Sequence, residues 1–168
     1  MPDAVSNPHR LPSIVVPSHY RITLAPDLAE ATFSGSVEIE VEVGQSTGQI
    51  QLNSADLQIS SAWVLDAIGA RTDASGIEHD VDMERVTLGF SSELSPGPYT
   101  IGADFTGILN DQLHGFYRST FTDEDGIEHT IATTQFESTH ARRGSASVNS
   151  AAFKAHLGVT LDELVGEF

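Results

Sequence analysis

Apolar and polar residues alternate along most of this chain with the period of two that is typical of β-strands. The clearest run covers residues 36–43, where a valine or an isoleucine stands at every second position. Its apolar members are Val37, Ile39, Val41 and Val43, and its acidic members are Glu38, Glu40 and Glu42. Because neighbouring side chains on a strand point to opposite faces, this run predicts a strand with one core face and one solvated, acidic face.

Shorter runs of the same kind follow one another, with turn residues between them. Strands are expected at residues 20–24, 50–52, 57–59, 63–68, 86–90, 99–105 and 157–161. No window of useful length before Arg143 has the period of a helix. Many short strands at this spacing predict an all-β fold, and specifically an antiparallel β-sandwich.

A β-hairpin is expected within residues 107–143. Asp125 and Gly126 can supply the positive φ angles of a tight turn between two β-prone runs. On the second arm Gln135 and Glu137 are two residues apart, so they share one face of the strand. This pair is the best candidate for chemistry, because a carboxylate and an amide can both accept hydrogen bonds from a ligand. An ordinary solvated strand face is the other interpretation of the same spacing.

Length and charge narrow the classes of function. A chain of 168 residues is expected to form one domain, or one domain with a short extra piece, and to bury about 70% of the surface that its unfolded form exposes. Its 24 acidic and 8 basic residues give a formal charge of -16, so neither nucleic acid nor a membrane is expected as a partner. Residues 1–10 lack the features of a secretory signal and are interpreted as a flexible leader, which favours a cytoplasmic protein.

Two Glu-His pairs raise the question of a metal site. Both Glu78-His79 and Glu128-His129 stand in the tetrapeptide Gly-Ile-Glu-His. Adjacent residues on a strand point to opposite faces, so neither pair can easily bind one ion. The chain has no cysteine, no His-Glu-x-x-His motif, and no other histidines at the spacing of metal ligands. No metal or other cofactor is therefore expected in this chain.

Three stretches of the chain resemble, in the same order, stretches near the start of the proteins of a known family. The first is Leu11-Pro12 followed by Val-Pro-Ser-His-Tyr-Arg-Ile-Thr-Leu at 16–24, and the second is Phe-Ser-Gly-Ser-Val-Glu-Ile at 33–39. The third combines Gly-Phe-Tyr-Arg-Ser at 115–119 with Thr-Gln-Phe-Glu-Ser-Thr-His-Ala-Arg-Arg at 134–143. Together they resemble the N-terminal domain of the aminopeptidase N family of zinc metallopeptidases, the gluzincin aminopeptidases. The resemblance implies a β-rich domain that precedes a zinc-binding catalytic domain.

The resemblance is interrupted at residues 144–151. The family typically carries Phe-Pro-x-x-Asp-Glu-Pro there, whereas this chain reads Gly-Ser-Ala-Ser-Val-Asn-Ser-Ala. A small, flexible, polar segment is expected in place of a rigid acidic one. The family register returns at 152–160, and the likeness fades after Asp162. We therefore expect one β-sandwich domain over residues 11–168, with an atypical segment at 144–151 and an incomplete C-terminal end.

The resemblance also implies substrate-binding roles for two residues, and it shows which residues of the family's catalytic site this chain lacks. Glu137 would accept hydrogen bonds from the substrate's ammonium group, and Gln135 would line the pocket for its first side chain. The zinc ligands and the Gly-x-Met-x-Asn strand of the family do not occur here, so zinc would belong to a missing catalytic domain. One hydrogen bond to a charged group contributes about 1.5 to 3 kcal/mol, whereas a millimolar complex needs about 4 kcal/mol. Without the missing domain, Glu137 and Gln135 should not bind a peptide with measurable affinity.

Two functions from different classes follow. The first is the N-terminal domain of an aminopeptidase N-like enzyme, which contacts the N-terminus of a peptide substrate and is inactive alone. The second is a free-standing β-sandwich interaction module that pairs with a separate catalytic chain. Arg118, Arg142 and Arg143 can bind a substrate carboxylate in a different enzyme, but in so acidic a chain we expect them to pair with carboxylates. No motif in the sequence supports an independent enzyme with a new site.

Overall fold

The computed structural model describes residues 11–111, 115–135, 146–147 and 156–161, with the backbone alone at 115, 134–135 and 156–161. These residues form strands and turns and contain no helix. The strands are β1 (Val15–Asp27), β2 (Thr32–Val43), β3 (Thr47–Asn53), β4 (Leu57–Leu65), β5 (Arg71–Asp73), β6 (Gly76–Asp80), β7 (Arg85–Leu94), β8 (Gly97–Ile108), β9 (Gly115–Thr122), β10 (Glu128–Gln135) and β11 (His156–Leu161). The predicted all-β class is confirmed.

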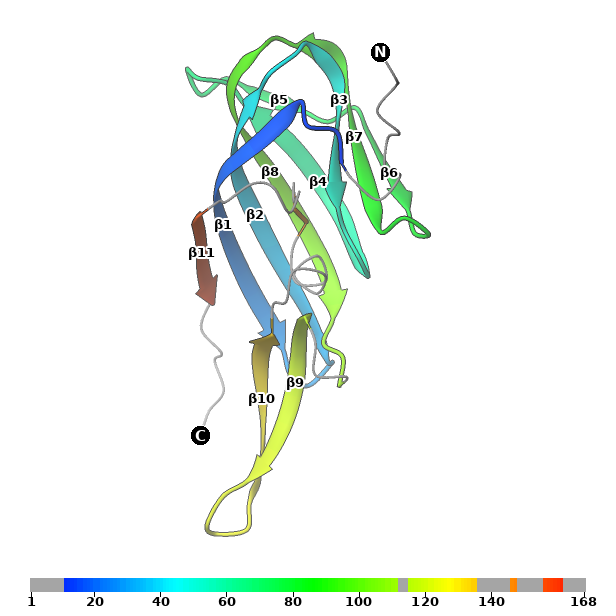
Figure 1. Ribbon diagram of the computed structural model, residues 1–168. Coiled ribbons are helices and arrows are strands. Elements are labelled where there is room, and N and C mark those ends of the chain that lie inside the picture. The colour runs from blue at the N-terminus through cyan, green and yellow to red at the C-terminus, as the bar shows by residue number, and fades with distance from the viewer. Residues whose placement is uncertain (1–10, 112–114, 136–145, 148–155, 162–168) are drawn as a thin grey trace, which may run out of the picture.

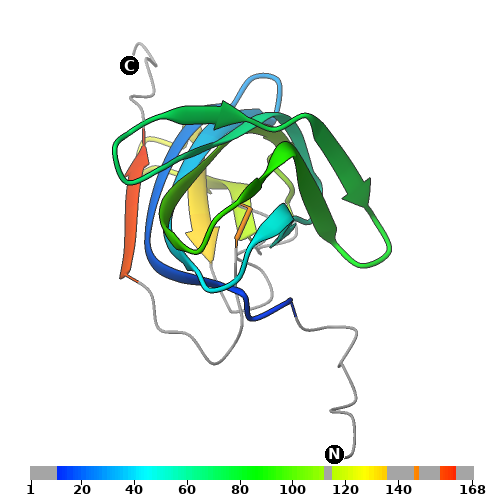
Figure 2. The same cartoon turned by 90° about the horizontal axis from the view of Figure 1, so that it is seen from above.

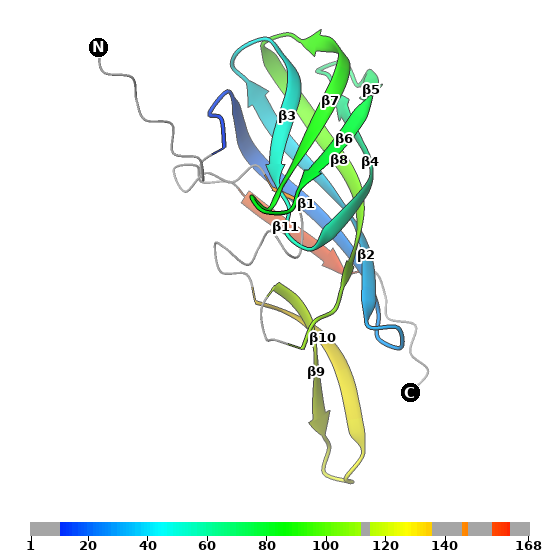
Figure 3. The same cartoon turned by 90° about the vertical axis from the view of Figure 1, so that its right-hand side faces the viewer.

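Two sheets face each other across one core (Figures 1 and 2). The larger has the strand order β11-β1-β2-β8-β4-β5, and the smaller has the order β3-β7-β6. All neighbouring strands are antiparallel except β1 and β11, which run parallel. The remaining two strands, β9 and β10, form a separate two-stranded sheet that extends beyond one end of the sandwich (Figure 3). This arrangement is the predicted sandwich with an added hairpin.

Alternation along the strands decides which side chains fill the space between the sheets. The apolar members of the run at residues 36–43 are all at most 4% exposed. They join buried side chains of the smaller sheet, such as Ile50, Leu52 and Leu88, in one continuous cluster. Burial of apolar area drives folding, so this cluster is the main source of stability for the domain.

The acidic face of β2 lies on the outside of the larger sheet. Glu40 and Glu42 are exposed, and Glu38 is half-buried. Arg21 on β1 donates hydrogen bonds to Glu38 at 3.0 Å and to Glu40 at 2.7 Å. The run of glutamates is therefore a solvated face with one arginine neighbour, as the alternation predicted.

Three aromatic side chains of the larger sheet stand directly opposite a glycine on the neighbouring strand. The pairs are Phe33 with Gly107, Phe105 with Gly35, and Trp63 with Gly102. A Cβ atom added to Gly107 would lie 2.4 Å from the Phe33 ring, and one added to Gly102 would lie 2.2 Å from the Trp63 ring. The glycines thus leave the space that the rings occupy, which fixes the register of β2, β8 and β4.

The strand expected at residues 63–68 has other bounds. β4 is continuous from Leu57 to Leu65, and Ile68 lies in the turn that follows, with 91% of its surface exposed. Oδ1 of Asp66 accepts hydrogen bonds from the backbone N–H of Ile68 at 3.0 Å and of Ala70 at 2.9 Å. Such local bonds to a side chain compete with pairing between strands, so the apolar Ile68 falls outside the sheet.

The chain returns to the sandwich after the hairpin. Ala146 is fully buried, and Ser147 exchanges two backbone hydrogen bonds with Asn53, of 2.7 and 2.9 Å. The remainder of the atypical segment at 144–151 and the leader at 1–10 lie outside the described residues. In the part of the chain that the structure describes, no helix is long and apolar enough to cross a membrane.

Candidate functional site in the β9–β10 hairpin

The root of the hairpin is fixed to the sandwich by one aromatic side chain. Phe116 on β9 is 1% exposed, and its ring centroid lies 5.0 Å from that of Phe33 in an edge-to-face arrangement. The backbone N–H of Arg118 also donates to the carbonyl of Asn110 at 3.0 Å. Beyond this root the two strands extend away from the sandwich (Figures 1 and 3).

The turn at the far end closes where the sequence predicted it. Gly126 has a φ of 80°, whereas Asp125 does not have a positive φ. The backbone N–H of Asp123 donates to the carbonyl of Ile127 at 3.0 Å, and the N–H of Gly126 donates to the carbonyl of Asp123 at 3.1 Å. Glycine therefore stands at the position of this turn whose backbone conformation is energetically unfavourable for other residues.

Asp123 organises the turn through its carboxylate. Oδ1 accepts hydrogen bonds from the N–H groups of Asp125 and Ile127, and Oδ2 lies 2.6 Å from Nε2 of His129. The hydrogen bond with His129, followed by those from the backbone, holds the pKa of Asp123 below its ordinary value. The His129 ring also stacks on Phe121, with centroids 5.2 Å apart.

Sequence reasoning missed the pair of Asp123 and His129 because it considered only adjacent residues. The two are six positions apart with the turn between them. An aspartate at the end of one strand and a histidine at the start of the next are neighbours across a hairpin. That spacing around an Asp-Gly turn was the signal in the sequence.

The strand register assigns the hairpin residues to two faces. Phe121 stands opposite His129, and Ser119 stands opposite Ile131, so these four belong to one row of alternating positions. Phe121 is 50% exposed and Ile131 is 42% exposed. The other face carries Phe116 and turns toward the core at the root. Beyond the root both faces of the hairpin are accessible, and we call the one that carries Phe121 and Ile131 the open face.

One of the two predicted substrate-binding residues, Gln135, lies at the end of this hairpin. Gln135 is the last residue of β10 and pairs with Gly115. Its backbone position belongs to the same row as Ile131, although its side chain is not among those that the structure describes. Glu137 lies outside the described residues, as do Arg142 and Arg143. The structure therefore places the strand that leads to the predicted pair.

The Glu-His pairs hold no metal site in the described residues. Glu78 and His79 are neighbours on β6, and Glu128 and His129 begin β10. No group of three histidine, aspartate or glutamate side chains in the described ranges is placed to hold a metal ion. His129 instead has the turn carboxylate of Asp123 as its partner. Both pairs leave a turn, as the sequence predicted.

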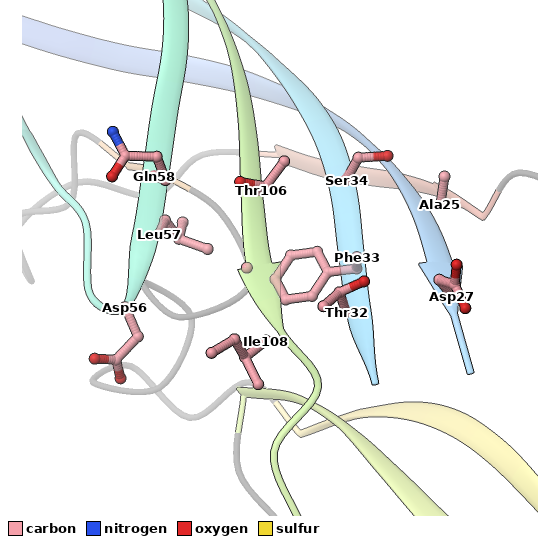
Figure 4. A pocket seen from close by; sticks show the side chains of 11 residues that line it. Ala25, Asp27, Thr32, Phe33, Ser34, Asp56, Leu57, Gln58, Thr106 and Ile108 are labelled. Atoms are coloured by element: carbon pink, nitrogen blue, oxygen red, sulfur yellow. The ribbon is translucent and has the colours of Figure 1, made fainter. Parts of the chain in front are cut away.

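A shallow pocket of about 670 Å³ lies at the end of the larger sheet, near the hairpin root (Figure 4). Ser34, Thr106 and Gln58 form a polar row across three strands, and Asp27 and Asp56 add two carboxylates. Neither a histidine nor a cationic side chain belongs to its described lining. The pocket can offer hydrogen bonds, but none of the site residues predicted from the sequence lines it.

Comparison with known proteins relates residues 16–163 to one family, described as the Peptidase M1 N-terminal domain. The chain is 31% identical to Puromycin-sensitive aminopeptidase of Caenorhabditis elegans, 38% to Aminopeptidase M1-D of Oryza sativa subsp. japonica and 35% to Endoplasmic reticulum aminopeptidase 1 of Homo sapiens. These alignments cover 96%, 91% and 92% of this chain. The chain spans only 17% of the length of each of these relatives.

Proposed function

The chain belongs to the Peptidase M1 N-terminal domain family, and from that premise we propose that it is the N-terminal, substrate-contacting part of an aminopeptidase. The family match over residues 16–163 carries the proposal, because relatives aligned over nearly the whole chain are named aminopeptidases. The proposed reaction is the removal of N-terminal residues from peptides. The chain spans 17% of those relatives, so the proposal assigns catalysis to the part of such an enzyme that this chain does not match.

Within that enzyme, Glu137 and Gln135 are proposed to hold the amino end of the substrate. An ionised carboxylate accepts charge-assisted hydrogen bonds from an ammonium group, and an amide can line the pocket beside it. The position of Gln135 at the end of β10 supports this role, because pairing with Gly115 fixes its backbone. A metal would supply the polarisation of the scissile carbonyl. The described residues offer such a metal no ligand set, so the proposal assigns its ligands to the part of the enzyme that this chain does not match.

The first test uses a chimera in which residues 1–168 replace the matched N-terminal part of the rice Aminopeptidase M1-D. We expect Glu137→Gln to lower kcat/KM for a free-amine aminoacyl substrate about 10- to 150-fold, which corresponds to the loss of about 1.5 to 3 kcal/mol. Glu124→Gln on the exposed turn is the matched control and should leave kcat/KM unchanged.

Equal kcat/KM values for the two variants would remove Glu137 from the site. Loss of all turnover in the unmutated chimera would contradict the assignment of this chain as an aminopeptidase N-terminal part. The isolated chain should release no N-terminal residues, and turnover by it would show that the catalytic groups lie in these 168 residues.

A second candidate function is a free-standing module that pairs with a separate catalytic chain. The observation that favours it is the open face of the hairpin, where Phe121 and Ile131 remain exposed. Sedimentation of the chain mixed with the rice enzyme from which the matched N-terminal part has been removed tests this candidate. Formation of a one-to-one complex with restored turnover would support it, and separate sedimentation would count against it.

A further inference from the structure

β6 is an edge strand of the smaller sheet. The sheet has the order β3-β7-β6, so β6 has β7 on one side and no described strand on the other (Figure 1). All residues of β6 except Ile77 are exposed, and Ile77 packs against the core. The edge of a sheet presents backbone N–H and C=O groups with which a further strand can pair. The outer edge of β6 is therefore a candidate site for strand addition.

The pairing on the other side of β7 determines which backbone groups of β6 face outward. Opposite residues of an antiparallel pair alternate between those that exchange hydrogen bonds and those that do not. Asn53 on β3 exchanges its backbone hydrogen bonds with Ser147, so it makes none with Arg85, which stands opposite on β7. Arg85 therefore directs its N–H and C=O groups toward β6, where Asp80 stands opposite.

Two residues of β6 consequently present their backbone to the outer edge. Steps of two from Asp80 lead to Glu78 and Gly76, which also bond with β7. The intervening Ile77 and His79 direct their N–H and C=O groups away from β7. Alternate outward pairs of this kind are the groups that an extended peptide uses when it adds a strand to a sheet.

The opposite edge of the same sheet is occupied at two positions. On β3, Ser147 bonds the outward groups of Asn53. The hydroxyl of Thr47 donates to the carbonyl of Gln49 at 2.7 Å and accepts from its N–H at 3.2 Å. No comparable bond to the outward groups of β6 occurs among the described residues. β6 is therefore the more open edge of the smaller sheet.

The side chains of β6 define the chemistry of a strand that fits beside it. Directly opposite residues on paired strands are neighbours, and opposite charges there are favourable. Glu78 and Asp80 share one face, Asp82 follows in the turn, and all three are exposed. On the other face Ile77 is half-buried against the core, so an apolar residue fits beside it. A fitting strand thus alternates basic with apolar side chains.

We propose that the outer edge of β6 binds an extended, basic segment of another protein by strand addition. Backbone hydrogen bonds to Ile77 and His79 provide affinity, and basic side chains opposite Glu78 and Asp80 provide specificity. A second copy of this chain fits poorly, because two β6 strands would bring their carboxylates together in chains of formal charge -16. This surface is separate from the hairpin and does not depend on the proposed function.

Hydrogen exchange in the 168-residue chain tests the proposal with a synthetic probe, the peptide acetyl-Lys-Val-Lys-Val-Lys-Val-Lys-amide. At saturating probe we expect the backbone N–H groups of Ile77 and His79 to exchange at least about 10-fold more slowly, because pairing suppresses their opening to solvent. Two control probes should give no protection. One has glutamate in place of lysine, and the other has N-methyl groups on its valines, which remove the N–H groups that would face β6.

Variants of the chain separate strand addition from a general attraction between a basic peptide and an acidic protein. Glu78→Lys with Asp80→Lys should abolish the protection. Glu124→Lys with Glu128→Lys is the matched control on another exposed acidic segment and should keep it. His79→Pro removes one outward N–H group without removing a bond to β7, and it should weaken binding of the probe about 5-fold.

Four results would overturn the proposal. Equal protection by the lysine probe and either control probe would mean that the peptide does not add as a strand with basic side chains. Protection that leaves out Ile77 and His79 would place the probe elsewhere. Protection of these two N–H groups in the concentrated chain without probe would make a second copy the occupant. Their slow exchange in the chimera described above, before the probe is added, would show that the rest of the enzyme covers this edge.

Discussion

At the scale of single residues, Asp123 shows how one side chain can define a turn. Its two carboxylate oxygens accept hydrogen bonds from two backbone N–H groups and contact the His129 ring. The backbone of the turn itself makes two hydrogen bonds. Hydrogen bonds to the charged form of an acid favour that form, which explains the lowered pKa of Asp123. The tip of the hairpin therefore depends on the charge of one residue.

The stability that Asp123 contributes should depend on pH with a definite sign. Its folded pKa is lowered from 3.8, so the contribution is present above the unfolded pKa and is lost as the pH falls through the folded pKa. We expect the amide resonances of Asp125 and Ile127 to titrate with a midpoint below 3.8, followed by nuclear magnetic resonance. Asp123→Asn should abolish that titration. A midpoint at or above 3.8 in the unmodified chain would contradict the assignment.

At the scale of elements, the pairing of aromatic residues with glycines holds the strands in register. The ring of Phe33 takes the place of a side chain at Gly107 and also meets the rings of Phe105 and Phe116. One side chain thus connects two strands of the sandwich with the root of the hairpin. A change at Gly107 should therefore affect the sheet and the hairpin together.

Gly107→Ala should destabilise the domain by about 1 to 3 kcal/mol, because the new methyl group would overlap a ring that cannot move away. The added Cβ would lie 2.4 Å from Phe33, whose surface is 2% exposed. Gly48→Ala is the control, since nothing lies within 4 Å of its added Cβ. Urea unfolding of the two variants measures the difference. A near-neutral Gly107→Ala would mean that Phe33 can relocate.

The elements also show what alternation can and cannot predict. The run at residues 36–43 has one face of valine and isoleucine, so its burial follows from the period alone. Ile68 has the same apolar character, but the carboxylate of Asp66 draws the backbone into a turn, which periodicity does not register. The parallel pairing of β11 with β1 was equally out of reach, because it joins residues far apart in the sequence.

For the candidate site, the turn at Asp125 and Gly126 and the strand that carries Gln135 were predictable, since turn chemistry and strand period are local signals. The packing of Phe116 on Phe33 was not, because it depends on how the hairpin meets the sandwich. The role of Glu137 remains a prediction, because that residue lies outside the described part of the chain. Local patterns thus predicted the elements, and long-range contacts determined how they meet.

At the scale of the whole molecule, charge opposes compactness. The formal charge of -16 means that carboxylates repel one another throughout a chain of 168 residues. The ion pairs of Arg21 with two glutamates offset little of this repulsion, because exposed ion pairs contribute about 0 to 1 kcal/mol. The apolar core between the two sheets must overcome this repulsion. Conditions that screen charge should therefore stabilise the domain.

Raising the salt concentration from about 10 mM to about 150 mM shortens the Debye length from about 30 Å to about 8 Å. We expect Tm at pH 7 to rise by about 2 to 4 °C, the shift that corresponds to about 1 kcal/mol in a domain of this size. The same experiment near pH 4.5, the isoelectric point, is the control and should show little change. A fall in Tm with salt at pH 7 would contradict the dominance of self-repulsion, and calorimetry measures it.

The parallel pairing of β11 with β1 has a consequence for biosynthesis. His19 pairs with His156, so one edge of the first strand stays unpaired until residue 156 has left the ribosome. Contacts between such distant residues form slowly, and an open strand edge is a template for pairing with other chains. The nascent chain therefore carries an open strand edge until residue 156 emerges, and a ribosome stalled before that residue would hold a binding site for a chaperone.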